Sequence, residues 1–317
     1  MITVAITEFE YNKAPRFFES MPDFEWIVAP SDEKSLAAAI RASGARHAVI
    51  GTVKYVDELY RALPPGGVIA RFGVGHDGVD KKLAARHHLL CVNTPGALDR
   101  SVAEFGIGVM IAAARHIGEC ATELHEGCWH NRVGTELFGK KLLIIGCGEI
   151  GTRLARIACH GFEMKVSGLV RTMPGEEKPP FESLHTDFAE AVRDADFISI
   201  HIPDAPENRL FIDREKLAMC KKSAILINTA RGAVLDESAL YDAITGGVIA
   251  GAALDVFETE PYVPKDPAKD LRKLPRVLLT PHLGSSTVAA CTRVARRVVE
   301  NLRAAEAGNH KAMDLLH

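Results

Sequence analysis

The sequence lacks several features that mark whole classes of protein. Its first residues, MITVAITEFE, alternate like a strand and lack the basic and apolar regions of a secretory signal peptide. No apolar run approaches the roughly 20 residues of a membrane-spanning helix. The 38 Lys and Arg residues nearly balance the 41 Asp and Glu residues and are spread along the chain. We therefore expect no insertion into a membrane and no nucleic-acid partner.

Paired cysteine motifs are also absent. The seven cysteines are scattered, their number is odd, and no two of them have CxxC spacing. This usage predicts buried, reduced thiols and a cytoplasmic protein rather than a disulfide framework. The sequence contains no cluster of metal-ligating residues, so we predict no metal site. It also contains no internal repeat, low-complexity tract or linker rich in Gly and Ser.

What the sequence does contain is a series of short apolar runs separated by helical patterns. Because the runs are apolar throughout, they predict strands buried on both faces, as in parallel sheets covered by helices. With 317 residues, 47% of them hydrophobic, the chain can form two cores. The alternation of strands and helices predicts an α/β fold with two doubly wound parallel-sheet domains. The clearest runs begin at Val4, His47, Lys141, Lys165, Asp196, Ala224, Ala250 and Arg276.

The order of these patterns predicts how the two domains share the chain. We assign residues 1–98 and 287–317 to a flavodoxin-like domain, and residues 99–286 to a Rossmann-type domain inserted in it. The last helix, at about 286–308, is expected to return to the first domain. Residues 101–117 predict a long helix, and 118–139 have little periodicity and predict an extended arm. Trp129 in this arm is expected to anchor packing or an interface.

A glycine-rich segment follows one of the apolar runs. The stretch KKLLIIGCGEIGTRLARIA places Gly146, Gly148 and Gly151 directly after a strand and at the start of an amphipathic helix. In this context GxGxxG predicts a dinucleotide-binding turn, in which the second glycine admits the pyrophosphate. The N-terminus of the helix adds amide donors and the positive end of its dipole. A tight strand–helix turn without a ligand is the alternative.

The end of the next apolar run indicates which dinucleotide binds. In an NAD site, an acidic residue about 20 positions after the first glycine binds the adenosine ribose. Here that place falls at Leu169, Val170 or Arg171, none of which is acidic. The planar donors of Arg171 can attract a 2′-phosphate, helped by the hydroxyl group of Thr172. We therefore predict NADP(H), and an NAD(H) site in which Arg171 stacks on adenine is the alternative.

Three further apolar runs each lead into a polar residue. Arg231 ends the stretch AILINTARG, Glu260 lies in AGAALDVFETEP, and His282 follows RVLLT. In an open α/β sheet, ligands bind at the carboxyl ends of the strands. The three side chains are therefore expected at the same sheet edge as the glycine turn. Taken singly, each has a structural alternative as an ion-pair partner, a surface acid or a loop histidine.

Taken together, these segments resemble the D-isomer-specific 2-hydroxyacid dehydrogenase family. The resemblance covers nearly the whole chain, in the order RFGVGHDGVD, VNTPGA, SVAE, GCGEIG, HIPDAPENRLFID, INTARGAVLDESAL, LDVFETEP and TPHLGSS. It implies an oxidoreductase that transfers a hydride between NAD(P)H and the C2 carbonyl of a small 2-keto acid. It also implies that the first domain binds the substrate and the inserted domain binds the cofactor.

The resemblance further implies a role for each polar residue. Arg231 would bind the carboxylate and carbonyl of the 2-keto acid. His282 would donate a proton to the carbonyl oxygen, and Glu260 would hydrogen-bond to His282, orient it and raise its pKa. Backbone amides at Val74 and Gly75 would hold the substrate carboxylate. The other cofactor contacts implied are Glu149, Ile150, His201, Pro203, Thr229 and Asp255.

The loop GTVKYVD bears on the choice of substrate. In the family, the loop after this strand supplies specificity, and here its cation is Lys54, which either meets a second anionic group or is exposed to solvent. We favour glyoxylate or hydroxypyruvate, with D-3-phosphoglycerate dehydrogenase activity as the alternative. Because the chain ends soon after its last helix, we expect no regulatory domain of the kind found in some phosphoglycerate dehydrogenases.

The helix at residues 101–117 bears on assembly. It is apolar on nearly every face, and such a helix is buried in a core or an interface. Since dimers are usual in the family, we predict a homodimer built on this helix and the arm after it. Some relatives with this fold are NAD(H)-sensing corepressors, but the short termini and the Arg–Glu–His set disfavour that role. Formate dehydrogenases share the architecture but have glutamine where this chain has Glu260, so Glu260 disfavours that activity.

Overall fold

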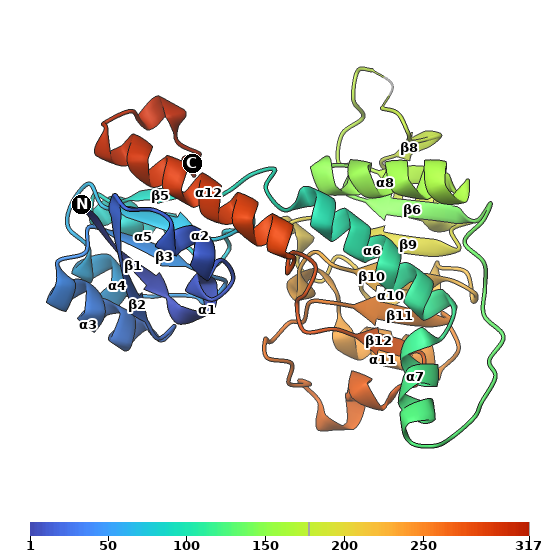
Figure 1. The fold of residues 1–317 in the computed structure, drawn as a ribbon. Coiled ribbons are helices and arrows are strands. Elements are labelled where there is room, and N and C mark those ends of the chain that lie inside the picture. The colour runs from blue at the N-terminus through green and yellow to red at the C-terminus, as the bar shows by residue number, and fades with distance from the viewer. Residues whose placement is uncertain (177, 317) are drawn as a thin grey trace. The chain divides into compact units, whose positions relative to one another are not determined.

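The computed structural model describes residues 1–176 and 178–316 and divides into two compact units (Figure 1). The first unit comprises Met1–Leu98 and Ser285–His317. The second unit, Asp99–Gly284, is inserted into the first in chain order. In the described residues, no helix is long and apolar enough to cross a membrane.

The first unit is built on a parallel sheet. Its five described strands have the order β2-β1-β3-β4-β5, the order of flavodoxin-like sheets. The elements are β1 (Ile2–Thr7), α1 (Glu8–Tyr11), α2 (Pro15–Glu19), β2 (Phe24–Ala29), α3 (Glu33–Ser43), β3 (His47–Ile50), α4 (Glu58–Ala62), β4 (Val68–Arg71), α5 (Lys81–Arg86), β5 (Leu90–Val92), α12 (Val288–Glu306) and η5 (His310–Ala312).

Helices cover both faces of this sheet. Alternate residues of a strand point to opposite faces, so Val4 and Ile6 pack in the core that contains α12, whereas Ala5 packs in the core that contains α3, α4 and α5. The segment after α12 extends the sheet, because Leu315 bridges Val92 of β5 in antiparallel orientation. In Figure 1 this last helix crosses the sheet of the first unit.

The second unit is a seven-stranded parallel sheet in its described residues. The strand order is β12-β11-β10-β9-β6-β7-β8, which extends the Rossmann order outward from β6. The prediction of two doubly wound α/β sheets is therefore confirmed. The elements are α6 (Asp99–Ala114), α7 (Ile117–His125), β6 (Lys141–Ile145), α8 (Glu149–Phe162), β7 (Lys165–Leu169), β8 (Ser183–His185), α9 (Phe188–Val192), β9 (Phe197–Ile200), η1 (Pro206–Asn208), α10 (Arg214–Ala218), β10 (Ile225–Asn228), η2 (Gly232–Val234), α11 (Glu237–Thr245), β11 (Gly251–Leu254), η3 (Pro267–Lys269), η4 (Leu271–Lys273) and β12 (Val277–Leu279).

Two hydrophobic cores bury this second sheet. Leu142 and Ile144 of β6 face the core formed with α6 and α8, whereas Leu143 and Ile145 face the core formed with α9, α10 and α11. Strands covered on both faces must be apolar at every position, which is the pattern that the sequence carries. Polar loops follow the carboxyl ends of these strands.

The long helix and the arm differ from the sequence-based prediction. The helix ends at Ala114, and a second helix, α7, begins at Ile117 after His116 adopts a left-handed conformation with φ of 55°. Residues 118–125 were therefore wrongly assigned to an extended arm. Arg132, which follows the helix, forms ion pairs with Glu119 and Glu123 on it, and such contacts leave no periodic pattern in the sequence.

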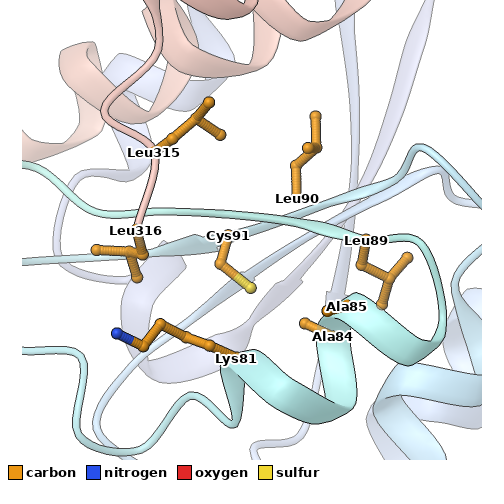
Figure 2. Close-up of a pocket in the computed structure, with 8 residues that line it drawn as sticks. All are labelled: Lys81, Ala84, Ala85, Leu89, Leu90, Cys91, Leu315 and Leu316. Atoms are coloured by element: carbon orange, nitrogen blue, oxygen red, sulfur yellow. The ribbon is translucent and has the colours of Figure 1, made fainter.

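The cysteines are free thiols in the structure. Cys91, Cys147 and Cys291 are buried, as predicted for the whole set, but Cys128 is exposed beyond the end of α7. Figure 2 shows a small pocket of about 200 Å³ in the first unit, between α5, β5 and Leu315–Leu316, toward which Cys91 points. Burial raises the pKa of Cys91 to about 11, so its thiol stays protonated near neutral pH.

Candidate active site

The glycine turn joins β6 to α8 in the second unit. Gly146 has a φ of 95°, and a side chain there would lie 2.7 Å from the carbonyl oxygen of His201, so only glycine fits. Gly148 is the N-cap of α8, and Glu149 and Ile150 form the first turn of that helix. The 14-residue helix directs its N-terminal amides and positive dipole end at this turn.

Two observations test whether a dinucleotide fits this edge of the sheet. A Cβ added at Gly148 would meet no described atom within 4 Å, so the turn is open where a pyrophosphate would approach. Thr229, directly after β10, has a buried hydroxyl oxygen with no hydrogen-bond partner in the described part of the chain. Buried polar atoms are nearly always paired, and a bound carboxamide or ribose would supply the partner. The residues present fit a dinucleotide.

Arg171 lies in the loop after β7, as the sequence indicates. Its side chain is 86% exposed, and its Nη1 lies 3.3 Å from Oε1 of Glu207 in η1. Thr172 beside it is also exposed. The contact between Glu207 and Arg171 has no local signal in the sequence, because 36 residues separate them. Exposed ion pairs are worth little, so this contact leaves Arg171 available to a stronger anion.

His201 follows β9 and is held by a neighbour on the same strand. Its Nε2 lies 2.8 Å from the hydroxyl oxygen of Ser199, and its amide donates to the carbonyl oxygen of Ile145 at 2.7 Å. Burial lowers the pKa of His201 to about 4, so this imidazole is neutral near pH 7. Pro203, two residues later, is exposed in the same loop.

Arg231 follows β10 and is fixed by its own turn. The side-chain amide of Asn228 donates to the carbonyl oxygen of Arg231 at 2.9 Å, and its oxygen accepts from the amide of Ala230 at 3.1 Å. Asn228 is fully buried. Asn228 was not singled out from the sequence, although an amide side chain at the end of an apolar strand is a local signal for such a turn.

Glu260 and His282 form the central contact of the site. Glu260 lies in the loop after β11 and His282 in the loop after the neighbouring strand β12. His282 Nδ1 is 2.7 Å from Oε2 of Glu260, and the other carboxylate oxygen accepts from the amide of Phe257 at 3.1 Å. Both side chains are about one-third exposed, so the pair can meet a ligand.

The pKa of Glu260 reflects this contact. Burial acts to raise the pKa of the Glu260 carboxyl, and the hydrogen bond and charge of His282 act to lower it. The Phe257 amide and the charge of Arg231 act in the same direction, and the pKa is lowered overall. Glu260 is therefore a carboxylate that Arg231 also reaches electrostatically.

Asp255 supports the loop that carries His282. Its carboxylate accepts from the hydroxyl of Thr280 at 2.6 Å and from the amides of Leu283 and Gly284, each at 2.8 Å. Burial raises the pKa of Asp255 although these bonds oppose it. Only 2% of Asp255 is exposed, and its cofactor contact stays a prediction.

The predicted substrate residues of the first unit follow adjacent strands. Lys54 lies in the loop after β3 and is exposed. Val74 and Gly75 lie in the loop after β4, where Thr94 N donates to the carbonyl oxygen of Gly73 and Asn93 Nδ2 to that of Val74. Because a trans peptide directs its N–H opposite to its C=O, the amides of Val74 and Gly75 point away from these contacts.

Within the second unit, the predicted residues gather at one sheet edge. Gly146, His201, Arg231, Glu260 and His282 follow strands that are neighbours in the order β6, β9, β10, β11 and β12. In residues 1–176 and 178–316, no group of three or more His, Cys, Asp or Glu side chains could hold a metal ion. The chemistry available at this edge is proton transfer beside a guanidinium group.

Comparison with known proteins places this geometry in context. The family model for the D-isomer specific 2-hydroxyacid dehydrogenase, NAD binding domain, matches residues 107–284. Hydroxypyruvate reductase of Thermotoga maritima is 41% identical over 238 residues, covering 74% of this chain and 76% of the relative. D-3-Phosphoglycerate dehydrogenase of Mycobacterium tuberculosis is 38% identical over 295 residues, or 90% of this chain. The match covers 53% of that relative, so this chain spans about half its length.

A solved structure extends the likeness to the whole fold. The NADPH-dependent glyoxylate/hydroxypyruvate reductase of Sinorhizobium meliloti, in complex with NADP and malonate, has a TM-score of 0.80 and 28% identity. The comparison covers 96% of this chain and 93% of that one. The second unit thus matches the NAD binding domain of that family. The chain belongs to the D-isomer specific 2-hydroxyacid dehydrogenase family, as its motifs predict.

Proposed function

We propose that the protein reduces a small 2-keto acid to the D-2-hydroxy acid and prefers NADPH to NADH. The observation that carries the proposal is the 2.7 Å contact between His282 Nδ1 and Glu260 Oε2. A hydrogen-bonded imidazole–carboxylate pair is a general acid–base group, which reduction of a carbonyl requires. It lies on the same sheet whose strand β6 leads into the glycine turn.

Proton transfer is the task of His282. Because Nδ1 is held by Glu260, Nε2 is the nitrogen that donates the proton to the carbonyl oxygen. The carboxylate of Glu260 stabilises the imidazolium form before transfer, and the ring is neutral afterwards. A dihydronicotinamide bound at this edge would supply the hydride. In the reverse direction, neutral His282 accepts the hydroxyl proton of the 2-hydroxy acid.

Two sets of groups are proposed to orient the substrate. Arg231 binds the carboxylate and carbonyl of the 2-keto acid through charge-assisted hydrogen bonds. The amides of Val74 and Gly75 bind the same carboxylate, in keeping with the direction in which their peptide planes are held. Both contacts persist during reduction because the carboxylate keeps its charge.

The dinucleotide is proposed to lie along the carboxyl ends of the second sheet. Arg171 and Thr172 would receive the 2′-phosphate of NADP(H), and NAD(H) is the alternative if Glu207 keeps Arg171 engaged. The residues proposed to hold the rest of the cofactor are Gly146, Gly148, Glu149, Ile150, Gly151, His201, Pro203, Thr229 and Asp255.

The second candidate is D-3-phosphoglycerate dehydrogenase activity. Exposed Lys54 could bind a phosphate on the substrate, and the Mycobacterium tuberculosis relative carries that name. We favour glyoxylate or hydroxypyruvate because the solved relative that covers both units is named for those substrates and for NADPH. Lys54→Met distinguishes the two: it raises KM for 3-phosphohydroxypyruvate alone if the phosphate binds there.

We further propose that the protein is a cytoplasmic homodimer. Trp129 and Val133, after α7, are 85% and 95% exposed, and Phe138 is exposed nearby. Apolar side chains clustered on one segment indicate an interface. Free cysteines are typical of a reducing compartment.

The decisive experiment is a panel of 2-keto acids assayed with NADPH and NADH in parallel. We expect the highest kcat/KM for glyoxylate or hydroxypyruvate with NADPH. Preference for 3-phosphohydroxypyruvate would favour the second candidate, and preference for NADH would overturn the cofactor assignment. No reduction of any 2-keto acid, by protein that binds NADPH, would refute the proposed function.

A further inference from the structure

The backbone of the loop Phe72–Gly75 has all four of its carbonyl groups engaged. The carbonyl oxygen of Gly73 accepts from the amide of Thr94 at 3.1 Å, and that of Val74 accepts from Asn93 Nδ2 at 2.7 Å. The carbonyl oxygens of Phe72 and Gly75 both accept from the Arg71 side chain. In the described residues, the amides of Val74 and Gly75 donate no such bond. The carbonyl groups of the loop are thus held in place, while the two successive amides of Val74 and Gly75 are directed away from these contacts.

Arg71 is the centre of this arrangement. It ends strand β4, only 8% of it is exposed, and its Nε donates to the carbonyl oxygen of Gly75 at 2.7 Å. Its Nη1 donates to the carbonyl oxygen of Phe72. One guanidinium group therefore joins the first and last residues of the loop. Arginine suits this role because its planar donors can reach two acceptors at once.

Gly73 shows how closely the loop wraps the guanidinium group. Its φ is 136°, and a Cβ added there would lie 2.2 Å from Nη1 of Arg71. The place of a side chain is therefore taken by Arg71 itself. The glycine and the arginine are required together, because either one replaced alone would displace the loop.

Asn93 holds the loop from a second side and is itself fixed. Its carbonyl oxygen accepts from Asn301 Nδ2 at 3.2 Å, and its amide donates to the carbonyl oxygen of Asp314 at 3.3 Å. Asn301 is 1% exposed, and its Oδ1 accepts from the backbone amide of Asp314. The carboxylate of Asp314 in turn accepts from Nη2 of Arg297 at 2.7 Å. The side-chain amide of Asn93 is thus held at the end of a buried network and directed at Val74.

We propose that Arg71 and Asn93 are positioning residues that preset the amides of Val74 and Gly75 for the substrate carboxylate. The inference rests on the proposed function for the identity of the anion. It adds that affinity for the 2-keto acid depends on two side chains behind the loop. A preset loop binds more tightly because it loses little conformational freedom on binding.

The test uses Arg71→Met, Arg71→Lys and Asn93→Ala, with Arg41→Met as the matched control. Arg41 belongs to the same unit but forms only an exposed ion pair with Glu58 at 3.7 Å. Loss of hydrogen bonds from a charged group is expected to raise KM for the 2-keto acid about 10- to 100-fold in Arg71→Met. The KM of Arg71→Lys should lie between those of Arg71→Met and the parent, and the KM of Arg41→Met should match that of the parent. Because the carboxylate is bound equally before and during reduction, kcat should change little.

Amide hydrogen exchange provides a readout that does not depend on turnover. The amides of Gly73 and Thr94, which donate to the carbonyl oxygens of Arg71 and Gly73, should exchange at least about 10-fold faster in Arg71→Met and Asn93→Ala, while the rest of the first unit keeps its parental rates. The dissociation constant for NADPH should stay within about 2-fold, because the second unit is not altered. If the parent reduces no 2-keto acid but the variants show this local change, the proposed function is refuted, whereas the inference that Arg71 and Asn93 hold the loop stands.

Two results would overturn the inference. One is an unchanged KM in Arg71→Met together with unchanged exchange at the amides of Gly73 and Thr94. The other is faster exchange throughout the first unit, which would mean that Arg71 stabilises the domain generally and does not position the loop.

Discussion

The backbone amide of His282 donates to the backbone carbonyl oxygen of Asp255 at 2.9 Å. His282 has a φ of 55°, a left-handed conformation that is costly for a residue with a side chain. The loop keeps this conformation because the Asp255 carboxylate also binds the next two amides, of Leu283 and Gly284. Neighbouring strands thus fix the imidazole before any ligand arrives.

Replacing the proposed proton donor is the most direct test of the chemistry. In His282→Ala we expect kcat for 2-keto acid reduction to fall about 10²- to 10⁴-fold, the usual contribution of a general acid. Affinity for NADPH, measured by fluorescence titration, should stay within about 2-fold. The control His160→Ala, an exposed histidine of the same unit, should keep full activity. An equal loss of NADPH binding in His282→Ala would contradict the assigned role.

The charge of Glu260 predicts an effect on turnover. Its lowered pKa keeps the carboxyl ionised through the usual carboxyl range. Glu260→Gln removes the charge beside His282 while leaving an amide of similar shape, so kcat for reduction should fall about 10-fold or more. Glu215→Gln, at an exposed site, is the control. An unchanged kcat in Glu260→Gln would show that its charge does not act on His282.

The pair Arg171–Glu207 predicts opposite effects of two substitutions on the cofactor. Arg171→Ala should raise KM for NADPH about 10- to 100-fold and change KM for NADH little, because only NADPH carries the 2′-phosphate. Glu207→Gln should lower KM for NADPH a few-fold, because it removes a competing anion 3.3 Å from the guanidinium group. If both variants change KM for NADPH and KM for NADH alike, Arg171 does not bind the 2′-phosphate.

His201 predicts a pH dependence of stability. Its native pKa of about 4 lies below the unfolded value of about 6.5, so the unfolded state binds a proton first as pH falls. The free energy of unfolding should therefore drop between about pH 6.5 and 4 by up to about 1.4 kcal/mol per pH unit. In His201→Gln this part of the drop should disappear in urea titrations across that range. His160→Gln should keep the parental slope, and a parental slope in His201→Gln would exclude burial of a neutral ring.

The exposed aromatic segment predicts the assembly. The parent should be a dimer at micromolar concentration by light scattering, and Trp129→Asp should shift it toward the monomer. A buried tryptophan anchor typically contributes more than about 2 kcal/mol to an interface, or more than about 30-fold in dissociation constant. Val288→Asp, at an equally exposed apolar site of the first unit, is the control. A monomeric parent would refute the homodimer.

Several elements could be predicted because their signals are local. Each of the eight apolar runs coincides with a strand, since a strand covered on both faces must be apolar throughout. The remaining four described strands, β2, β4, β5 and β8, were not singled out. Strand β2 is interrupted by exposed Glu25, and β5 and β8 have only three residues each. The break at His116 was also missed, because a histidine does not by itself signal a left-handed conformation.

The sequence by itself determined the α/β class, the glycine turn and the family, because these depend on hydrophobic periodicity and short motifs that neighbouring residues complete. It also identified Arg231, Glu260 and His282 as the polar residues at the strand ends. The family resemblance already implied the contact between Glu260 and His282, whereas only the tertiary structure decided that Glu207 pairs with Arg171 and that Asn93 holds the loop at Val74. These last two contacts join separate loops, and their partners are set by the order of strands in each sheet.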